Sequence, residues 1–422
     1  MNRNTFWGTL AAVLLVVLAG LVYQEEASSI ASLEDMFSSS RLISQKTEAN
    51  ISQLVDANNR FGFDLFTQLQ QESPAQNIFI SPQSVAIALA MLRNGTSGET
   101  LQEITSTLKL EQLASGGIDS SYSKLIETLT TADSNLELAI ANSLWINQDV
   151  RLADQFVKTT LDFYQGRVTN LDFADPAAKN TINQWVASNT AHKITQIVDT
   201  TSPEDALYLI NAIYFKGSWT NKFDPQATVE QPFYLQSDTS KSVSMMSQTG
   251  DYRYYENEQF QAIRLPYGET AEMGMYIFLP QPDTTLEQFN QELSLDNWQE
   301  WLTQMRSQSG NISLPKFKLE YDTELQNALS TLGMSQAFNP TQADFSAMTD
   351  SAVAIDTIKH KAIIEVNEEG TEAAGVTSIG VRITSAMPQD QPFNMNIDRP
   401  FFFAIRDDIT ETMLFMGNVV EP

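Results

Sequence analysis

The 422-residue chain contains no cysteine and only two histidines, His192 and His360. The absence of cysteine excludes disulfide bonds, thiol nucleophiles and cysteine-based metal sites, so stability must come from packing. Two histidines leave a catalytic triad few candidates for its base. No G-x-S-x-G, H-E-x-x-H, phosphate-loop or calcium-loop pattern occurs in the sequence. We therefore expect no enzyme activity, no metal and no cofactor.

Basic residues are scarce as well, with 25 Lys and Arg against 52 Asp and Glu and a formal net charge of −27. Such a surface repels the phosphates of nucleic acids, so no nucleic-acid partner is expected. Binding to a polyanion such as heparin is not expected either, because the same acidic surface repels it; the predicted helix Ser120–Leu129 carries Lys124 as its one basic residue. The general meaning of this charge is a well-solvated surface.

One long hydrophobic run, Phe6 to Tyr23, follows Arg3 near the N-terminus. It fits a secretory signal peptide with Val17-Leu18-Ala19 as the cleavage site, or an uncleaved membrane anchor; a buried core helix is the third interpretation. The polar stretch that follows, Gln24 to Asn50, predicts a flexible tether. Residues 1–23 are thus a predicted signal peptide or anchor, and residues 24–51 a linker. We expect the body, residues 52–422, to be exported to the extracellular or periplasmic space, tethered to a membrane if the run is retained.

The body has no repeat and no internal Pro/Gly-rich linker, and the chain is 42% apolar, which favours one domain. Ser81 followed by Pro82 predicts the start of a helix, and the apolar spacing over 61–69 predicts an earlier one. The nearly continuous apolar run Leu207–Phe215 predicts a strand covered on both faces. Further strands are predicted over 273–279, 353–366, 401–405 and 413–420. Helices that come early and strands that come late indicate an α+β fold.

The most informative segment begins at Gly370 and alternates in character. Every second residue is small or apolar: Thr371, Ala373, Gly375, Thr377, Ile379, Val381 and Ile383. The intervening positions hold both charges of this stretch, Glu372 and Arg382. This alternation is typical of a half-buried strand, yet the segment lies within a loop of about 25 residues, a length typical of functional loops. An ordinary edge strand or hairpin arm is the alternative, but Gly370 and Gly375 suit a backbone that changes its dihedral angles. We infer a loop that can become a strand.

Several motifs, in order along residues 52–422, resemble those of the serpin family. The hinge motif is Glu368-Glu369-Gly370-Thr371-Glu372-Ala373-Ala374-Gly375. The others are Asn77-Ile78-Phe79-Ile80-Ser81-Pro82-Gln83-Ser84, Leu209-Ile210-Asn211-Ala212-Ile213-Tyr214-Phe215-Lys216-Gly217-Ser218-Trp219, Leu314-Pro315-Lys316-Phe317, Ala343-Asp344-Phe345-Ser346, His360-Lys361-Ala362, Arg399-Pro400-Phe401 and Leu414-Phe415-Met416-Gly417-Asn418-Val419. One of these motifs would be a weak signal, whereas the ordered set is highly specific.

The resemblance implies an α+β serpin fold with about three β-sheets, eight or nine helices and an exposed reactive-centre loop, in a prokaryotic-style exported member of the inhibitory type. It implies a metastable, irreversible suicide inhibitor of serine proteases, expected to act as a monomer. In such proteins the protease cleaves the loop, is held as an acyl-enzyme, and is displaced when the loop inserts into the main sheet and releases stored strain. A non-inhibitory serpin acting as a carrier or chaperone is the first alternative. An acidic extracellular binding protein whose loop is a recognition arm is the second.

The resemblance also assigns roles to residues. The shutter cluster, a polar group under the centre of the main sheet, would comprise Asn77, Ser81, Ser84, Asn211 and His360. The breach cluster, where the loop first enters the sheet, would comprise Trp219, Lys316 and Glu368, the last two as an ion pair. Counting fifteen residues from Gly370 places the reactive bond at Thr384–Ser385. This bond suits an elastase- or subtilisin-like protease. Arg382, which suits a trypsin-like enzyme, and Ala386 or Met387, which suit an elastase-like one, remain alternatives.

Overall fold

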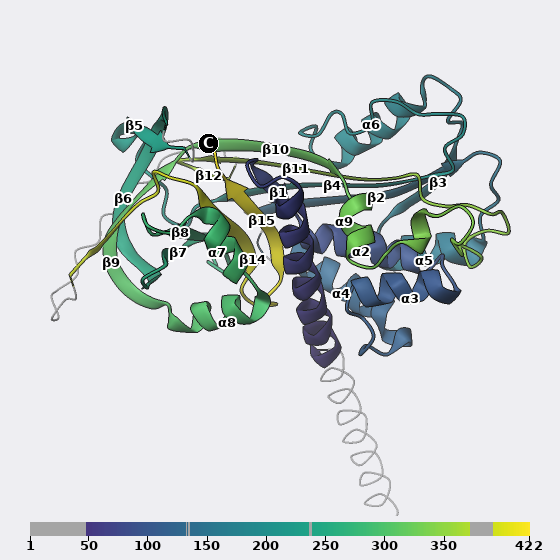
Figure 1. Cartoon of the computed structure of the whole chain (residues 1–422), viewed down its shortest axis with the longest axis horizontal. Coiled ribbons are helices and arrows are strands. Elements are labelled where there is room, and N and C mark those ends of the chain that lie inside the picture. The colour runs from purple at the N-terminus through teal and green to yellow at the C-terminus, as the bar shows by residue number, and fades with distance from the viewer. Residues whose placement is uncertain (1–47, 132, 134–135, 236–238, 372–390) are drawn as a thin grey trace, which may run out of the picture. The chain divides into compact units, whose positions relative to one another are not determined.

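The computed structural model describes residues 48–422 apart from 132, 134–135, 236–238 and 372–390 (Figure 1). The chain divides into two compact units, residues 1–52 and 53–422, and the second contains both β-sheets. Several predicted features lie outside the described residues. They are the apolar run 6–23, the predicted tether 24–51 up to residue 47, hinge residues 372–375 and the reactive bond Thr384–Ser385. Within the described part of the chain, no helix is long and apolar enough to cross a membrane.

A six-stranded sheet forms the centre of the unit 53–422. Its strands follow the spatial order β10 (Phe317–Glu324), β11 (Thr357–Asn367), β12 (Gly370–Thr371), β4 (Leu207–Ser218), β2 (Leu136–Asn147) and β3 (Arg167–Leu171). The two-residue strand β12 lies between β11 and β4 at one end and is antiparallel to both. Beyond it, β11 and β4 pair directly and in parallel, with Thr357–Ile363 opposite Tyr208–Tyr214. We call this direct β11–β4 pairing the seam.

Helices cover both faces of this sheet, as the apolar run in β4 predicts. Figure 1 shows α6 (Ala178–Asn189) on one face and α2 (Pro82–Arg93), α4 (Ile118–Thr130) and α5 (Asp154–Tyr164) on the other. Ile182 and Val186 of α6 are fully buried against residues of β2 and β4. Because neither face of β4 meets water, its side chains need not alternate between apolar and polar.

A second sheet contains nine strands among the described residues. Its main path runs β1 (Ile78–Ile80), β15 (Met413–Val419), β14 (Phe401–Asp407), β8 (Met273–Pro280), β7 (Phe260–Tyr267), β6 (Ser240–Glu256), β9 (Arg306–Pro315) and β13 (Phe393–Asn396), with β5 (Val229–Tyr234) paired to β6. Hydrogen bonding thus gives two sheets where about three were expected. The reason is the length of β6, which pairs with β5 and β9 over most of its course and with β7 at its end.

The remaining helices complete the α+β architecture. They are a helix over 48–72, α3 (Gly98–Thr107), α7 (Leu286–Glu292), α8 (Leu295–Gln304) and α9 (Gln326–Thr331), with short 3₁₀ turns η1 (Ser115–Gly117), η2 (Pro225–Ala227) and η3 (Gln336–Phe338). The predicted N-cap is confirmed, because Ser81 Oγ accepts a hydrogen bond from Ser84 N at 3.2 Å. The strand predicted over 353–366 begins only at Thr357, since Ile355 N donates a hydrogen bond to Ala337 O in η3.

Candidate functional site

The hinge enters the six-stranded sheet as β12. Gly370 has φ +149°, and a Cβ at this position would lie 2.1 Å from Gly217 O, so only glycine fits here. Thr371 is opposite Val366 on one side and Gly217 on the other. Its side chain is fully buried, with Oγ1 2.6 Å from the hydroxyl of Tyr267. The first residue of the alternating small set therefore points into the protein.

The breach cluster surrounds this point. Lys316 Nζ lies 2.9 Å from the carboxylate of Glu368, which also accepts a hydrogen bond from Thr228 Oγ1 at 2.8 Å. Burial opposes ionisation of Glu368, but the hydrogen bonds from Lys316, from its own backbone and from Thr228 bring the pKa below its ordinary value. Trp219 Nε1 donates to Asn367 O at 2.9 Å. The residues that carry the chain into β12 are thus held by side chains that lie directly beside the ends of strands: Trp219 after β4, Lys316 between β9 and β10, and Thr228 before β5.

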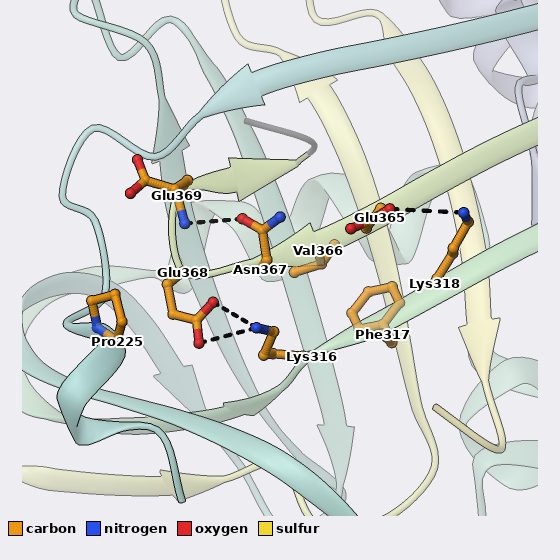
Figure 2. Close-up of a pocket in the computed structure, with 9 residues that line it drawn as sticks. All are labelled: Pro225, Lys316, Phe317, Lys318, Glu365, Val366, Asn367, Glu368 and Glu369. Atoms are coloured by element: carbon orange, nitrogen blue, oxygen red, sulfur yellow. Dashed lines mark hydrogen bonds and ion pairs between the residues drawn. The ribbon is translucent and has the colours of Figure 1, made fainter. Parts of the chain in front are cut away.

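Sequence reasoning missed part of this cluster. Lys222 pairs with Glu369 at 2.5 Å, and the N–H of Trp219 donates to Glu369 O at 2.9 Å. A cavity of about 500 Å³ is lined by Lys316, Glu368 and Glu369, among other residues (Figure 2). Its charged lining is already paired, Lys316 with Glu368 and Lys318 with Glu365, so we assign it no ligand.

The shutter cluster lies across the seam. His360 on β11 is opposite Asn211 on β4, and His360 Nδ1 is 2.5 Å from Asn211 Oδ1. The backbone N–H of Ser81 donates to His360 Nε2 at 3.2 Å, so Nε2 is unprotonated and Nδ1 carries the proton. Burial lowers the pKa of His360 to about 3, and the ring is therefore neutral at pH 7. Asn211 Nδ2 donates to Ser84 Oγ at 2.5 Å, which ties both strands to α2.

Asn142 on β2 also belongs to this cluster, although sequence reasoning missed it. Its Oδ1 accepts from Asn211 Nδ2 at 2.5 Å, and the two residues are opposite each other in the sheet. The sequence signal that could have identified it is a polar residue within an apolar strand. Asn142 is such a residue in β2, as Asn211 is in β4.

The structure does not place Asn77 in the shutter cluster, and this corrects the expectation. Asn77 Oδ1 accepts from Val420 N at 2.7 Å and from Glu421 N at 3.0 Å, while Nδ2 donates to Glu421 O at 2.6 Å. Asn77 precedes β1, and β1 pairs with β15 near the end of the chain. That pairing brings Asn77 to the C-terminal backbone instead of to the seam.

The second histidine does not join either cluster. His192 lies in the turn after α6, with φ +59°, whereas His360 is on β11. In the part of the chain that the structure describes, no group of three or more histidine, aspartate or glutamate residues could hold a metal ion.

Comparison with known proteins agrees with the fold. Residues 56–422 match the family model described as "Serpin (serine protease inhibitor)", and the chain therefore belongs to the serpin family. It is 35% identical to human leukocyte elastase inhibitor over 385 residues, covering 88% of this chain and 100% of the relative. It is 34% identical to an uncharacterized serpin-like protein of Methanosarcina acetivorans over 378 residues, covering 87% of each. Among solved structures, human thyroxine-binding globulin superposes with a TM-score of 0.82 at 28% identity, covering 88% of this chain and 99% of the other. The α+β serpin fold is thus confirmed.

Proposed function

We propose that this serpin is an irreversible suicide-substrate inhibitor of serine proteases and has no enzyme activity of its own. One observation carries the proposal: β12 already lies between β11 and β4, next to one end of the seam. Residues that follow Thr371 can extend the same strand, because the alternation of small and apolar residues continues to Ile383. The direct β11–β4 pairing beyond β12 is the place into which the strand would grow.

In the proposed reaction the loop is the substrate. The protease serine oxygen bonds to the carbonyl carbon of Thr384, the Thr384–Ser385 bond breaks, and the new Ser385 amine takes the proton that the serine gives up. The loop is then covalently attached to the protease as an ester. If the cut loop inserts into the seam before water hydrolyses the ester, the protease is carried away from the hinge and its active site is distorted. If hydrolysis comes first, the inhibitor has acted only as a substrate.

The shutter cluster would resist this opening until cleavage favours it. The Asn211–His360 contact crosses the seam, and a strand inserted between β4 and β11 must separate the two residues. Buried polar groups that lose a partner cost free energy unless they find another. The breach cluster has a related role at the β12 end of the seam, because Lys316 and Lys222 fix Glu368 and Glu369 directly before β12.

Protease preference follows from the proposed bait residue. Thr384 is small and uncharged, which suits elastase- or subtilisin-like enzymes, and one similar relative is named a leukocyte elastase inhibitor. Cleavage after Arg382 would instead indicate a trypsin-like target. Cleavage after Ala386 or Met387 would indicate an elastase-like target that cuts at a bond other than Thr384–Ser385. Mass spectrometry of the cut loop decides among these bonds.

The cellular setting is proposed from the N-terminal sequence. The apolar run 6–23 supports export to the extracellular or periplasmic space, with a membrane tether if it is retained. We expect a monomer whose partner is the target protease. Activation by heparin is not expected, because α4 carries Lys124 as its single Lys or Arg.

A non-inhibitory binding protein is the second candidate. The similarity to thyroxine-binding globulin favours it, since that protein is named for a ligand that it carries. The hinge composition argues against it, because Thr371, Ala373 and Gly375, the first residues of the alternating set, are small and uncharged.

The test is a panel of elastase, subtilisin, trypsin and chymotrypsin with gel analysis under denaturing conditions. An inhibitor gives a covalent complex that survives SDS, whereas a non-inhibitory serpin is cut without loss of protease. Thr371→Arg places a charge in a fully buried position and should convert the inhibitor to a substrate; Thr371→Ser, which keeps the hydroxyl, is the matched control. If Thr371→Arg traps protease as well as the wild type does, insertion from this hinge is wrong.

A further inference from the structure

The hydroxyl of Tyr267 is the side-chain partner of the first inserted hinge residue. Tyr267 is the last residue of β7 in the nine-stranded sheet, whereas Thr371 belongs to β12 in the six-stranded sheet. The two oxygen atoms are 2.6 Å apart, and both side chains are fully buried. Burial raises the pKa of Tyr267, an effect that the hydrogen bond to Thr371 opposes, so the phenol is protonated and able to donate at neutral pH.

The ring of Tyr267 is held in a fixed place relative to β4. It stacks on Trp219 at 4.4 Å between ring centroids and 12° between planes, and it meets Phe215 edge-on at 5.3 Å. Backbone bonds on either side reinforce this position, since Gly268 N donates to Ser218 O and Thr220 N donates to Pro266 O, both at 2.9 Å.

The absence of a side chain at Gly217 makes room for this arrangement. A Cβ at residue 217 would lie 3.1 Å from Tyr267 Cδ1 and 2.9 Å from Phe215 Cζ. Gly217 is also the β4 residue opposite Thr371. The same position therefore admits both the tyrosine ring and the hinge strand.

We propose that Tyr267 is a positioning residue for loop insertion: its hydroxyl holds Thr371 between β11 and β4 at one end of the seam in the uncut protein, so that insertion after cleavage extends an existing strand. This inference rests on the proposed inhibitory function. Because Thr371 already lies between β11 and β4, insertion of the loop does not need a slow first step in which the hinge separates two paired strands. The rate of loop insertion is then higher relative to the rate at which water hydrolyses the acyl-enzyme. Tyr267 touches neither the protease nor the reactive bond in this scheme, so it should leave the rate of acylation unchanged.

Three variants isolate the contact: Tyr267→Phe, Thr371→Val and the double variant. The partition ratio, which is the number of inhibitors cut per protease trapped, should rise about tenfold in each single variant, equal to about 1.4 kcal/mol. The second-order rate constant for loop cleavage should change less than twofold. The double variant should be no worse than either single variant, because removing both hydroxyls leaves no buried group without its partner.

A second measurement needs no protease. Hydrogen exchange in the uncut protein, read on a peptide that covers Val366–Thr371, should become about tenfold faster in Tyr267→Phe. The matched control is Tyr122→Phe, another fully buried tyrosine, which lies on α4 and whose hydroxyl donates to Asn58 Oδ1 at 2.8 Å. It should lose stability without changing the partition ratio or this exchange rate.

The outcomes separate the two proposals. If the wild type is cut without trapping any protease, the inhibitory function fails, and the role of Tyr267 in trapping fails with it. If the wild type traps protease and Tyr267→Phe has an unchanged partition ratio, the inhibitory function stands and the role of Tyr267 is wrong. Additive effects in the double variant would likewise overturn it, because they would show that the two hydroxyls act independently.

Discussion

Cutting the loop without trapping a protease should raise the melting temperature by about 13–25 °C. A zinc metalloprotease that cuts between Thr384 and Met387 is the suitable reagent, because it attacks with water and forms no acyl-enzyme. The cut frees the N-terminal part of the loop, which can then extend β12 along the seam. The expected gain in stability is the difference in folding free energy between the intact protein and the cut protein with its loop inserted.

The size of the shift follows from the seam. Insertion separates the direct β11–β4 pairing over Thr357–Ile363 but gives a strand paired on both sides, a net gain of about a dozen hydrogen bonds at about 1 kcal/mol each. Three large aliphatic residues, Ile379, Val381 and Ile383, add roughly 1.5–3 kcal/mol each on burial. Burial energies taken from an extended reference chain are upper estimates, so the gain is about 10–20 kcal/mol. Unfolding of the unit 53–422 has an entropy of about 0.8 kcal/mol per kelvin near 60 °C, which converts this gain to the stated shift.

The assay is differential scanning calorimetry of intact and nicked protein, with the cut mapped by mass spectrometry. Thr371→Arg, nicked in the same way, is the control and should show little or no gain, because its first inserted side chain would bury a charge. Equal melting temperatures for the intact and nicked wild type would refute the reasoning, since the intact fold would then store no free energy.

Three further predictions concern single residues. Asn211→Ala removes the partner of His360, Ser84 and Asn142 at once, and should lower the stability of the intact protein by roughly 3–6 kcal/mol; urea denaturation measures this, and a loss below about 1 kcal/mol would contradict the buried network. Gly370→Ala cannot keep β12 as observed, because of the contact that its Cβ would make with the β4 backbone; hydrogen exchange over the hinge should accelerate, and unchanged protection would argue against the strand. The pKa of His360 is about 3 in the folded protein against about 6.5 unfolded. The contribution of the neutral ring to stability is therefore complete above pH 6.5 and is lost as the pH falls toward 3, by about 1.4 kcal/mol per pH unit. His360→Gln should be less sensitive to acid than the wild type between pH 6 and pH 4, and parallel stability profiles would contradict the burial of the imidazole.

Much of the local structure could be predicted from the sequence. The N-cap at Ser81, the strand over Leu207–Phe215 and the inward direction of Thr371 each depend on neighbours a few residues away. Capping chemistry, hydrophobic runs and alternation are local signals of this kind. The ion pair between Lys316 and Glu368 could be anticipated only through the family resemblance, because nothing local relates two residues on different strands.

Which residues belong to the polar clusters was harder to predict from the sequence. Asn77 and Asn142 are both asparagines beside apolar segments, yet only Asn142 reaches the seam. Strand pairing decides this, since β2 lies next to β4 whereas β1 lies next to β15. Lys222 and Thr228, which hold the hinge, carry no motif that distinguishes them from other surface residues.

The sequence by itself determined the alternation of small or apolar residues from Thr371 to Ile383, because side-chain size and spacing are properties of consecutive residues; that this segment inserts as a strand is our proposal. The tertiary structure alone decided where that strand begins and what holds it. Asn211 and His360 are 149 positions apart in the chain, and Tyr267 and Thr371 are 104 apart. The first contact depends on which strands pair within the six-stranded sheet, and the second on how the two sheets pack against each other. No local pattern of residues specifies either arrangement.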